Sequence, residues 1–219
     1  MAKNGVQDYL VKTELGQASL MRTIQYAVER HRLTEEKDKV NAELGRLILI
    51  DPLTELFNRR GLEKVLSREA AWVRRHRSSL VAMLLDLDDF KRINDTLGYL
   101  AGDQVLKQVA QNLTKSLRAT DYVFRVGGDE FVILLPQTKL ADGLTVAEKV
   151  RLAIAEVPIS LSSHELRISA SLGVSEVTSD ITSIDELLGK TNPPLSKSKR
   201  EGKNRVSDAA SNTSSLPPL

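Results

Sequence analysis

The sequence predicts a mixed α/β domain, in which helices cover one central β-sheet, preceded by a helical stalk. Three observations favour this fold class. Residues 80–85 (LVAMLL) form an unbroken apolar run, typical of a strand buried on both faces. Amphipathic helical patterns precede and follow this run, and two shorter apolar segments flank a Gly-Gly pair. A chain of 219 residues with 41% hydrophobic content can also form one core of about 150 residues.

The composition restricts the chemistry. The 31 basic and 29 acidic residues nearly cancel, so we expect no nucleic-acid partner and no membrane insertion. There is no cysteine, which excludes disulfides, thiolate metal sites and a cysteine nucleophile. The amino terminus lacks the pattern of a signal peptide and the longest apolar run is too short to span a bilayer, which favours a cytoplasmic protein. The three histidines lack ligand-like spacing, so catalysis would depend on carboxylates and a metal.

The stalk is predicted over residues 31–50. Leu33, Val40, Leu44 and Leu47 are spaced seven, four and three residues apart, which indicates a short coiled coil. A solvated connector helix is the alternative, because Lys37 occupies one position of the apolar seam.

The main domain is predicted to begin at the Asp51-Pro52 pair, since proline disfavours helical geometry in the residue before it. Asn58 can cap the next helix, whose apolar face contains Leu62, Val65 and Leu66. Residues 76–79 then form a polar loop before the buried strand at 80–85, which ends at Asp86.

The second half of the domain alternates helices and strands. A helix is expected over residues 104–117 and another over 140–157, because their apolar residues fall on one helical face. Between them, residues 122–126 and 131–135 form a hairpin with Gly127-Gly128 in the turn and Asp129 and Glu130 at its tip. Residues 168–174 alternate as in a half-buried strand. The domain ends at Val206, and residues 207–219 form a disordered tail, rich in Ser, Asn and Pro.

Two acidic clusters are the candidates for chemistry. One is residues 86–89 (DLDD) at the end of the buried strand, and the other is Asp129-Glu130 on the hairpin. Carboxylates gathered at the edge of an apolar sheet repel each other unless a cation neutralises them, and hard oxygen ligands select Mg²⁺ or Mn²⁺. Solvated acidic loops are the alternative reading.

The segment after the first cluster indicates a nucleotide ligand. Lys91 offers charge to a phosphate, while Asn94 together with an Asp of this stretch, Asp95 or Asp103, can read the edge of a guanine through amide and carboxylate hydrogen bonds. Gly98 and Gly102 would let the backbone approach this ligand closely. A purine triphosphate fits these residues.

Five ordered motifs carry a family resemblance. They are Asp51-Pro52-Leu53-Thr54, Asn58-Arg59-Arg60, Asp86-Leu87-Asp88-Asp89-Phe90-Lys91, Ile93-Asn94-Asp95 with Gly102-Asp103, and Gly127-Gly128-Asp129-Glu130-Phe131. Over residues 51–206 the chain therefore resembles the GGDEF diguanylate cyclases, whose domain has a nucleotidyl-cyclase-like fold. Residues 1–30 resemble the last strand and helix of a response-regulator receiver domain.

The resemblance implies an enzyme that condenses two GTP molecules into cyclic di-GMP and two pyrophosphates, as a homodimer with magnesium or manganese. A catalytically weak or inactive domain that senses GTP or cyclic di-GMP is the alternative. The implied catalytic residues are Asp86, Asp129 and Glu130, which with the backbone carbonyl of Leu87 also form the metal site. The implied GTP-binding residues are Phe90, Lys91, Asn94, Asp103, Lys199 and Lys203.

Arg118 and Asp121 match the family's product-binding inhibitory site. A guanidinium and a carboxylate at this spacing can also bind a guanine nucleotide, although alone they would be read as an exposed ion pair. Lys149 or Arg151 on the next helix could add a second cation.

The closing helix departs from the family pattern. Pro193-Pro194 stands where the family has an Ala-Leu-Tyr run, and proline inside a helix costs about 3 kcal/mol or more. We therefore expect this helix to be delayed or shortened, which puts the placement of Lys199 and Lys203 in question.

Overall fold

The computed structural model describes residues 21, 24–35, 49–161, 165–178, 181 and 183–209. The chain divides into two compact units, Met1–Ile48 and Leu49–Leu219. Most of the expected receiver remnant, residues 1–30, and most of the predicted stalk seam lie outside the described residues.

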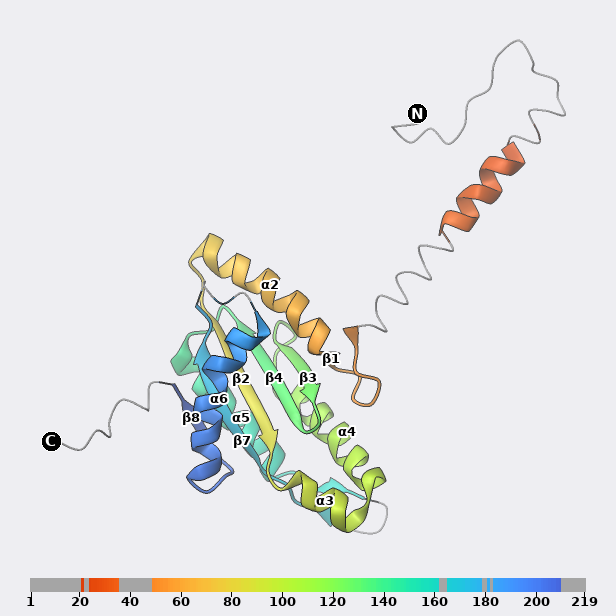
Figure 1. Ribbon diagram of the computed structural model, residues 1–219. Helices are drawn as coiled ribbons and strands as arrows, with labels where there is room; N and C mark the ends of the chain where they lie inside the picture. Colours follow the sequence, from red (N-terminus) through yellow and green to blue (C-terminus); the bar gives the residue numbers. More distant parts are fainter. Residues whose placement is uncertain are drawn as a thin grey trace. The chain divides into compact units, whose positions relative to one another are not determined.

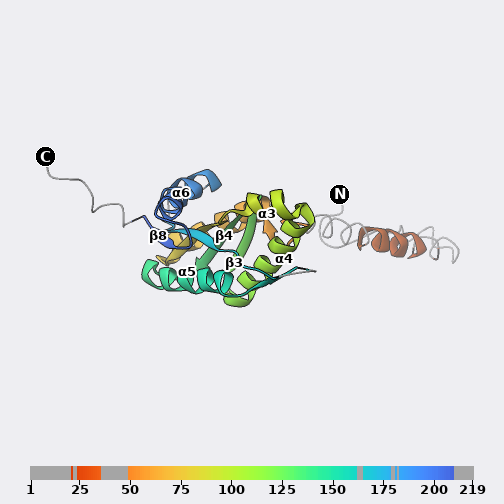
Figure 2. The ribbon, with the colours of Figure 1, turned by 90° about the horizontal axis from the view of Figure 1, so that it is seen from below.

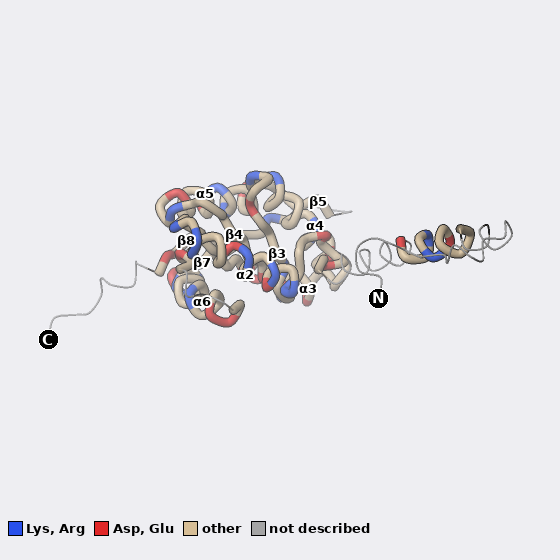
Figure 3. The backbone as a smooth tube through the Cα atoms, turned by 90° about the horizontal axis from the view of Figure 1, so that it is seen from above, with Lys and Arg blue, Asp and Glu red and all other residues tan. Residues whose placement is uncertain are grey.

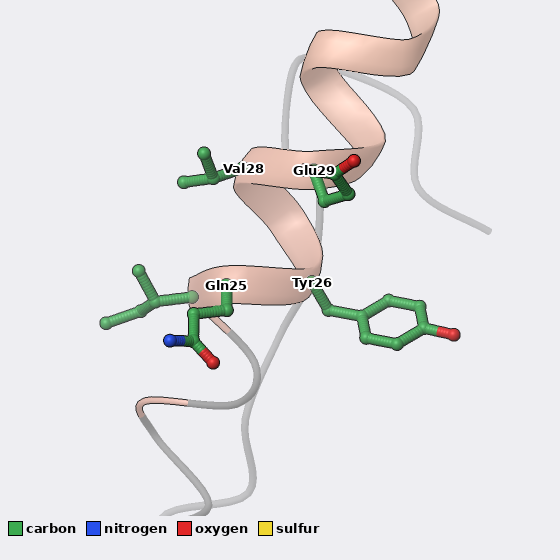
Figure 4. A pocket seen from close by; sticks show the side chains of 5 residues that line it. Gln25, Tyr26, Val28 and Glu29 are labelled. Carbon is green, nitrogen blue, oxygen red and sulfur yellow. The ribbon is translucent and has the colours of Figure 1, made fainter.

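Within the first unit, residues 24–35 form a helix. Its large apolar side chains are exposed, including Tyr26 at 79% and Val28 at 62%. These two side chains point away from one another, as Figure 4 shows, so they do not form one apolar seam. Leu33 is exposed as well, and the residues predicted to continue its heptad lie outside the described part of the chain.

Figure 1 labels most of the helices and strands of the second unit. In chain order the elements of this unit are β1 (Phe57–Asn58), α2 (Arg59–His76), β2 (Leu80–Leu87), α3 (Phe90–Leu97), α4 (Tyr99–Ser116), β3 (Tyr122–Gly127), β4 (Glu130–Pro136), α5 (Leu140–Ala155), β5 (Ile159–Ser160), β6 (Glu165–Leu166), β7 (Ala170–Glu176), α6 (Ile184–Arg200) and β8 (Val206–Asp208).

The central sheet has six strands in the order β1-β3-β4-β2-β7-β8, and β5 and β6 form a separate two-stranded sheet. The pairs β1/β3 and β7/β8 are parallel, whereas β3/β4, β4/β2 and β2/β7 are antiparallel. The mixed sheet confirms the predicted fold class. All eight residues of β2 are buried, as its unbroken apolar run predicts.

Helices cover both faces of the sheet. The face under α4 and α5 is packed by residues such as Met83, Val109 and Val150, and the opposite face, under α2 and α6, by residues such as Leu66, Leu84 and Leu187. Figure 2 shows α5 and α6 on opposite sides of the strands. The predicted cap on α2 is confirmed, because the Asn58 side chain accepts hydrogen bonds from the amides of Arg60 and Gly61.

Two predictions about local structure are wrong. The helix expected from residue 104 begins at Tyr99, and a separate helix, α3, precedes it. Gly102 is therefore a buried helical residue, and a Cβ there would collide with the side-chain oxygen of Asn94. The strand β7 is also buried on both faces rather than half-buried, because Ser171, Gly173 and Ser175 pack beneath α6.

The closing helix is neither delayed nor shortened. It starts at Ile184, where Ser183 and Glu186 form a capping box, and it continues through both prolines to Arg200. Pro193 is exposed and Pro194 is buried.

The predicted end of the domain is two residues too early. Strand β8 pairs with β7 as far as Asp208, so residues 207 and 208 belong to the sheet rather than to a disordered tail. Ser207 also contacts Ser198 of α6 through a buried hydroxyl pair at 2.9 Å.

Candidate metal and nucleotide site

The two acidic clusters meet where β2 and β4 pair. Asp86 at the end of β2 stands opposite Glu130, and the amide of Leu87 donates to the carbonyl of Asp129 at 3.4 Å. Gly128 and Asp129 form the turn, while Glu130 is the first residue of β4 rather than part of the tip as predicted. The antiparallel register therefore places at one edge of the sheet the three carboxylates that the sequence suggests as catalytic.

Arg125 fixes the shape of this turn. Its guanidinium donates two hydrogen bonds to the carbonyl of Gly128, at 3.0 and 2.8 Å, and pairs with Asp51 at 3.0 Å. Asp51 is held in turn by the amide and hydroxyl of Thr54, at 2.9 and 2.6 Å. Burial alone would raise the pKa of Asp51, but the hydrogen bonds from Thr54 and Arg125 outweigh it and lower the pKa below 3.8.

The electrostatics around Asp86 suit a cation. Burial raises the pKa of Asp86 above 3.8, and the negative charges of Asp129 and Glu130 raise it further, while Lys199 opposes them. The ammonium of Lys199 lies 2.8 Å from the Asp86 carboxylate. The Lys199 ammonium thus lies where negative charge accumulates, and a metal cation would be stabilised there by the same carboxylates. No three acidic or histidine side chains of the described residues stand close enough to hold one ion together.

The neighbouring carboxylates have different surroundings. Asp88 is buried and accepts hydrogen bonds from the hydroxyls of Ser169 and Ser171 and from the amide of Asn204, at 2.6, 2.7 and 3.0 Å. Asp89 is exposed and pairs with Lys203 at 2.7 Å, and this hydrogen bond lowers the pKa of Asp89. Lys203, like Lys199, thus contacts an acidic side chain at the edge of the site.

The corner between α3 and α4 gathers the expected guanine-binding residues. Asn94 on α3 lies directly against Gly102 on α4, and Asp103 follows Gly102. Both polar side chains are partly exposed, so a ligand can reach them. Phe90, whose ring is buried below this corner, and the exposed Lys91 form the start of α3, where backbone amides favour an anion.

The pair predicted to bind product lies elsewhere, after α4. Arg118 and Asp121 line a hollow of about 230 Å³ together with Thr138 and Asp142. The Asp121 carboxylate accepts the Arg118 backbone amide at 2.9 Å, and no salt bridge between the two side chains is present.

Lys149 and Arg151, the two candidates for a further cation beside Arg118, lie in different surroundings. Lys149 donates to the carbonyl of Ser116 at 2.8 Å and so lies near Arg118. Arg151 instead contacts Glu148 and Asn204, at 2.6 and 2.7 Å. Of these two cations, Lys149 is therefore the one that lies near the hollow.

Surface charge is mixed, as Figure 3 shows with acidic and basic residues together on α5 and α6. Of the helices in the described part of the chain, none has the length and apolar character needed to cross a membrane.

Sequence reasoning missed the supporting residues of the site. The sequence singles out Asp51 only as part of the motif that begins the domain. It does not single out Arg125, although Arg125 is the basic residue closest to the Gly-Gly pair. The role of the Ser169 and Ser171 hydroxyls as donors to Asp88 could not be predicted, because a serine in an alternating strand pattern is usually interpreted as facing water.

Comparison with known proteins supports one family. Residues 48–205 match the family described as "Diguanylate cyclase, GGDEF domain". The chain is 42% identical over 160 residues to the diguanylate cyclase DgcP of Pseudomonas aeruginosa, covering 72% of this chain and 23% of that protein. It is 32% identical over 205 residues to the response regulator PleD of Caulobacter vibrioides, covering 92% and 45%. The chain thus spans less than half the length of these relatives.

A solved structure agrees with the sequence match. The coiled coil and GGDEF domain of DgcB from Caulobacter crescentus, in complex with c-di-GMP, superposes with a TM-score of 0.75 at 28% identity. The match covers 88% of this chain and all of the DgcB chain.

Proposed function

Because the chain belongs to the GGDEF domain family, we propose that it is a diguanylate cyclase, which condenses two GTP molecules into cyclic di-GMP and two pyrophosphates. The observation that carries this proposal is the pairing of Asp86 with Glu130 across β2 and β4, with Asp129 in the adjoining turn.

The reaction needs two equivalent steps. In each, the 3′-hydroxyl oxygen of one GTP attacks the α-phosphorus of the other, a P–O bond forms, and the bond to pyrophosphate breaks. The hydroxyl proton must leave, and Glu130 is the carboxylate that we assign to accept it. Asn94 and Asp103 hold the guanine through its hydrogen-bonding edge, while Lys91 and the start of α3 bind phosphate oxygens.

Magnesium or manganese would be held by Asp86, Asp129, Glu130 and the Leu87 carbonyl, and the three carboxylates would have to move closer together than they stand in this structure. The ion would offset negative charge on the phosphate oxygens. Lys199 and Lys203, which contact Asp86 and Asp89, would turn to the phosphates when nucleotide is bound. We expect the enzyme to act in the cytoplasm, where GTP is found.

The test is a direct assay. Purified protein incubated with GTP and Mg²⁺ should form cyclic di-GMP, detected by chromatography, with no product when ATP replaces GTP or when a chelator removes the metal. Binding of GTP without any product would favour the second candidate, a nucleotide sensor.

A homodimer follows from the chemistry, since we assign one GTP to each subunit. Activity per molecule should fall on dilution of the full chain and recover as the protein is concentrated. A specific activity that is flat across dilution would contradict the dimer.

Product inhibition is proposed at the hollow lined by Arg118 and Asp121, with Lys149 as the second cation. Arg118→Ala should relieve inhibition by added cyclic di-GMP and leave the initial rate with fresh GTP nearly unchanged. Arg151→Ala is the matched control and should leave inhibition intact, because Arg151 is bonded to Glu148 and Asn204. Equal inhibition of wild type and Arg118→Ala would show that the pair is an ordinary surface feature.

A further inference from the structure

Helix α6 contains a defect that the rest of the fold has to accommodate. In a regular helix, the amide of residue 194 would donate to the carbonyl of Lys190, and the amide of residue 193 to that of Gly189. Prolines at both positions remove both donors. The carbonyls of Gly189 and Lys190 therefore need other partners.

The Lys190 carbonyl has a donor from the sheet. The hydroxyl of Ser175 in β7 donates to it at 2.8 Å, and Ser175 is only 3% exposed. Gly189 and Pro193 are exposed, whereas Pro194 is buried. All five residues line one hollow of about 400 Å³.

The same helix carries a residue of the site. Its backbone runs so close to β7 that a Cβ on Gly173 would collide with the Thr191 carbonyl and the Leu195 amide. Farther along, the Ser198 hydroxyl donates to the Leu172 carbonyl at 2.8 Å, and the next residue, Lys199, reaches Asp86. The position of Lys199 thus depends on how α6 is fastened to β7.

We propose that Ser175 is a positioning residue: its hydroxyl replaces the donor that Pro194 cannot supply, and so keeps α6 docked with Lys199 at Asp86. The hydrogen bond spans the two elements and closes the gap in the helix at the same time. The consequence for the nucleotide rests on the proposed function, because it is Lys199 that we expect to meet phosphate.

A double-mutant cycle, measured by thermal unfolding, tests the hydrogen bond from Ser175 to the Lys190 carbonyl. Ser175→Ala should lower the melting temperature by about 3–8 °C, because it removes the hydroxyl that donates to the Lys190 carbonyl. In a Pro194→Ala background the restored amide can serve Lys190, so the same change should cost much less. Ser171→Ala, on the same strand but bonded to Asp88, is the control and should combine additively with Pro194→Ala. Equal costs of Ser175→Ala in both backgrounds would overturn the proposal.

The positioning of Lys199 has its own readout. Acetylation of surface lysines, followed by mass spectrometry, should show faster labelling of Lys199 in Ser175→Ala, restored by Pro194→Ala, while Lys149 labels at a constant rate. Unchanged labelling of Lys199 would overturn its positioning by Ser175.

Nucleotide binding completes the test. In a Glu130→Gln background, which prevents turnover, Ser175→Ala should weaken GTP binding about three- to tenfold, and this loss should vanish when Lys199 is also changed to Ala. An equal loss without Lys199 would contradict the link to that residue. Failure of the wild type to bind GTP would count against the proposed function alone, since the melting and labelling results do not depend on nucleotide.

Discussion

Two carboxylate regions lie next to each other at the end of β2, and they differ in what surrounds each oxygen. The first, which we call the crowded region, contains Asp86, Asp129 and Glu130, and the Lys199 ammonium pairs with Asp86. The second, which we call the clamped region, is Asp88, which accepts hydrogen bonds from two hydroxyls and a backbone amide. The first arrangement leaves negative charge in need of a cation, whereas the second satisfies it within the fold. Carboxylates two residues apart in the chain therefore have opposite electrostatic surroundings.

The sharpest way to separate the two regions is Glu130→Gln. It should reduce cyclic di-GMP formation by about a thousandfold, the scale of losing a group that stabilises charge in the transition state. The melting temperature should not fall, because the change relieves repulsion in the crowded region. Thermal unfolding and the chromatographic assay measure both effects on one preparation, and a variant that keeps full turnover would contradict the assignment of Glu130.

Asp88→Ala should show the reverse pattern. Removing the acceptor leaves two hydroxyls and an amide without a partner, and we expect a loss of about 3 kcal/mol in the free energy of unfolding, or about 6–12 °C in melting temperature. Urea titration measures the loss. Asp89→Ala is the matched control, since its exposed carboxylate should contribute little. Comparable stability of the two variants would break the distinction between the regions.

The smallest expected effect concerns the turn that joins the crowded region to Asp51. Because the pKa of Asp51 is lowered in the folded protein, its contribution to stability is present above the unfolded value near 3.8 and is lost as pH falls through the folded value. Asp51→Asn should therefore destabilise the protein by about 1 kcal/mol at neutral pH and by less in acid. Unfolding measured from pH 7 to pH 3 tests this, and a constant difference between the two proteins would show that the Asp51 charge is not involved.

Much of the fold follows from patterns that the sequence displays. The run at 80–85 predicts the buried centre of the sheet, and Asn58 predicts the start of α2, because burial and capping act through local residue types. Helix α3 is not predicted, because it has only eight residues and Gly98 follows it directly. From the sequence alone, Gly98 is interpreted as a glycine that lets the backbone approach a ligand. The prediction for α6 was wrong for another reason. The free-energy cost of its two prolines was estimated from the helix alone, whereas the hydroxyl of Ser175, which donates to the Lys190 carbonyl, belongs to strand β7.

The candidate site divides in the same way. The paired acidic clusters were expected from motif and strand pattern, and the register of β2 and β4 brings them together. Their roles toward metal and GTP remain predictions. Arg125 and the serines of β7 could not be predicted, since their importance lies in tertiary contacts that leave no periodic trace in the sequence. The separation of Arg151 from Arg118 likewise depends on the loop after α6.

The late position of α6 and its loop in the chain has a consequence for biosynthesis. Strands β2 and β4 leave the ribosome well before residues 199–204, which supply the ammonium for Asp86, the ammonium for Asp89 and the amide for Asp88. Until these residues emerge, the nascent sheet carries its acidic edge without any of these partners. The acidic edge of the emerging domain is thus completed by nearly the last segment of the domain to be translated.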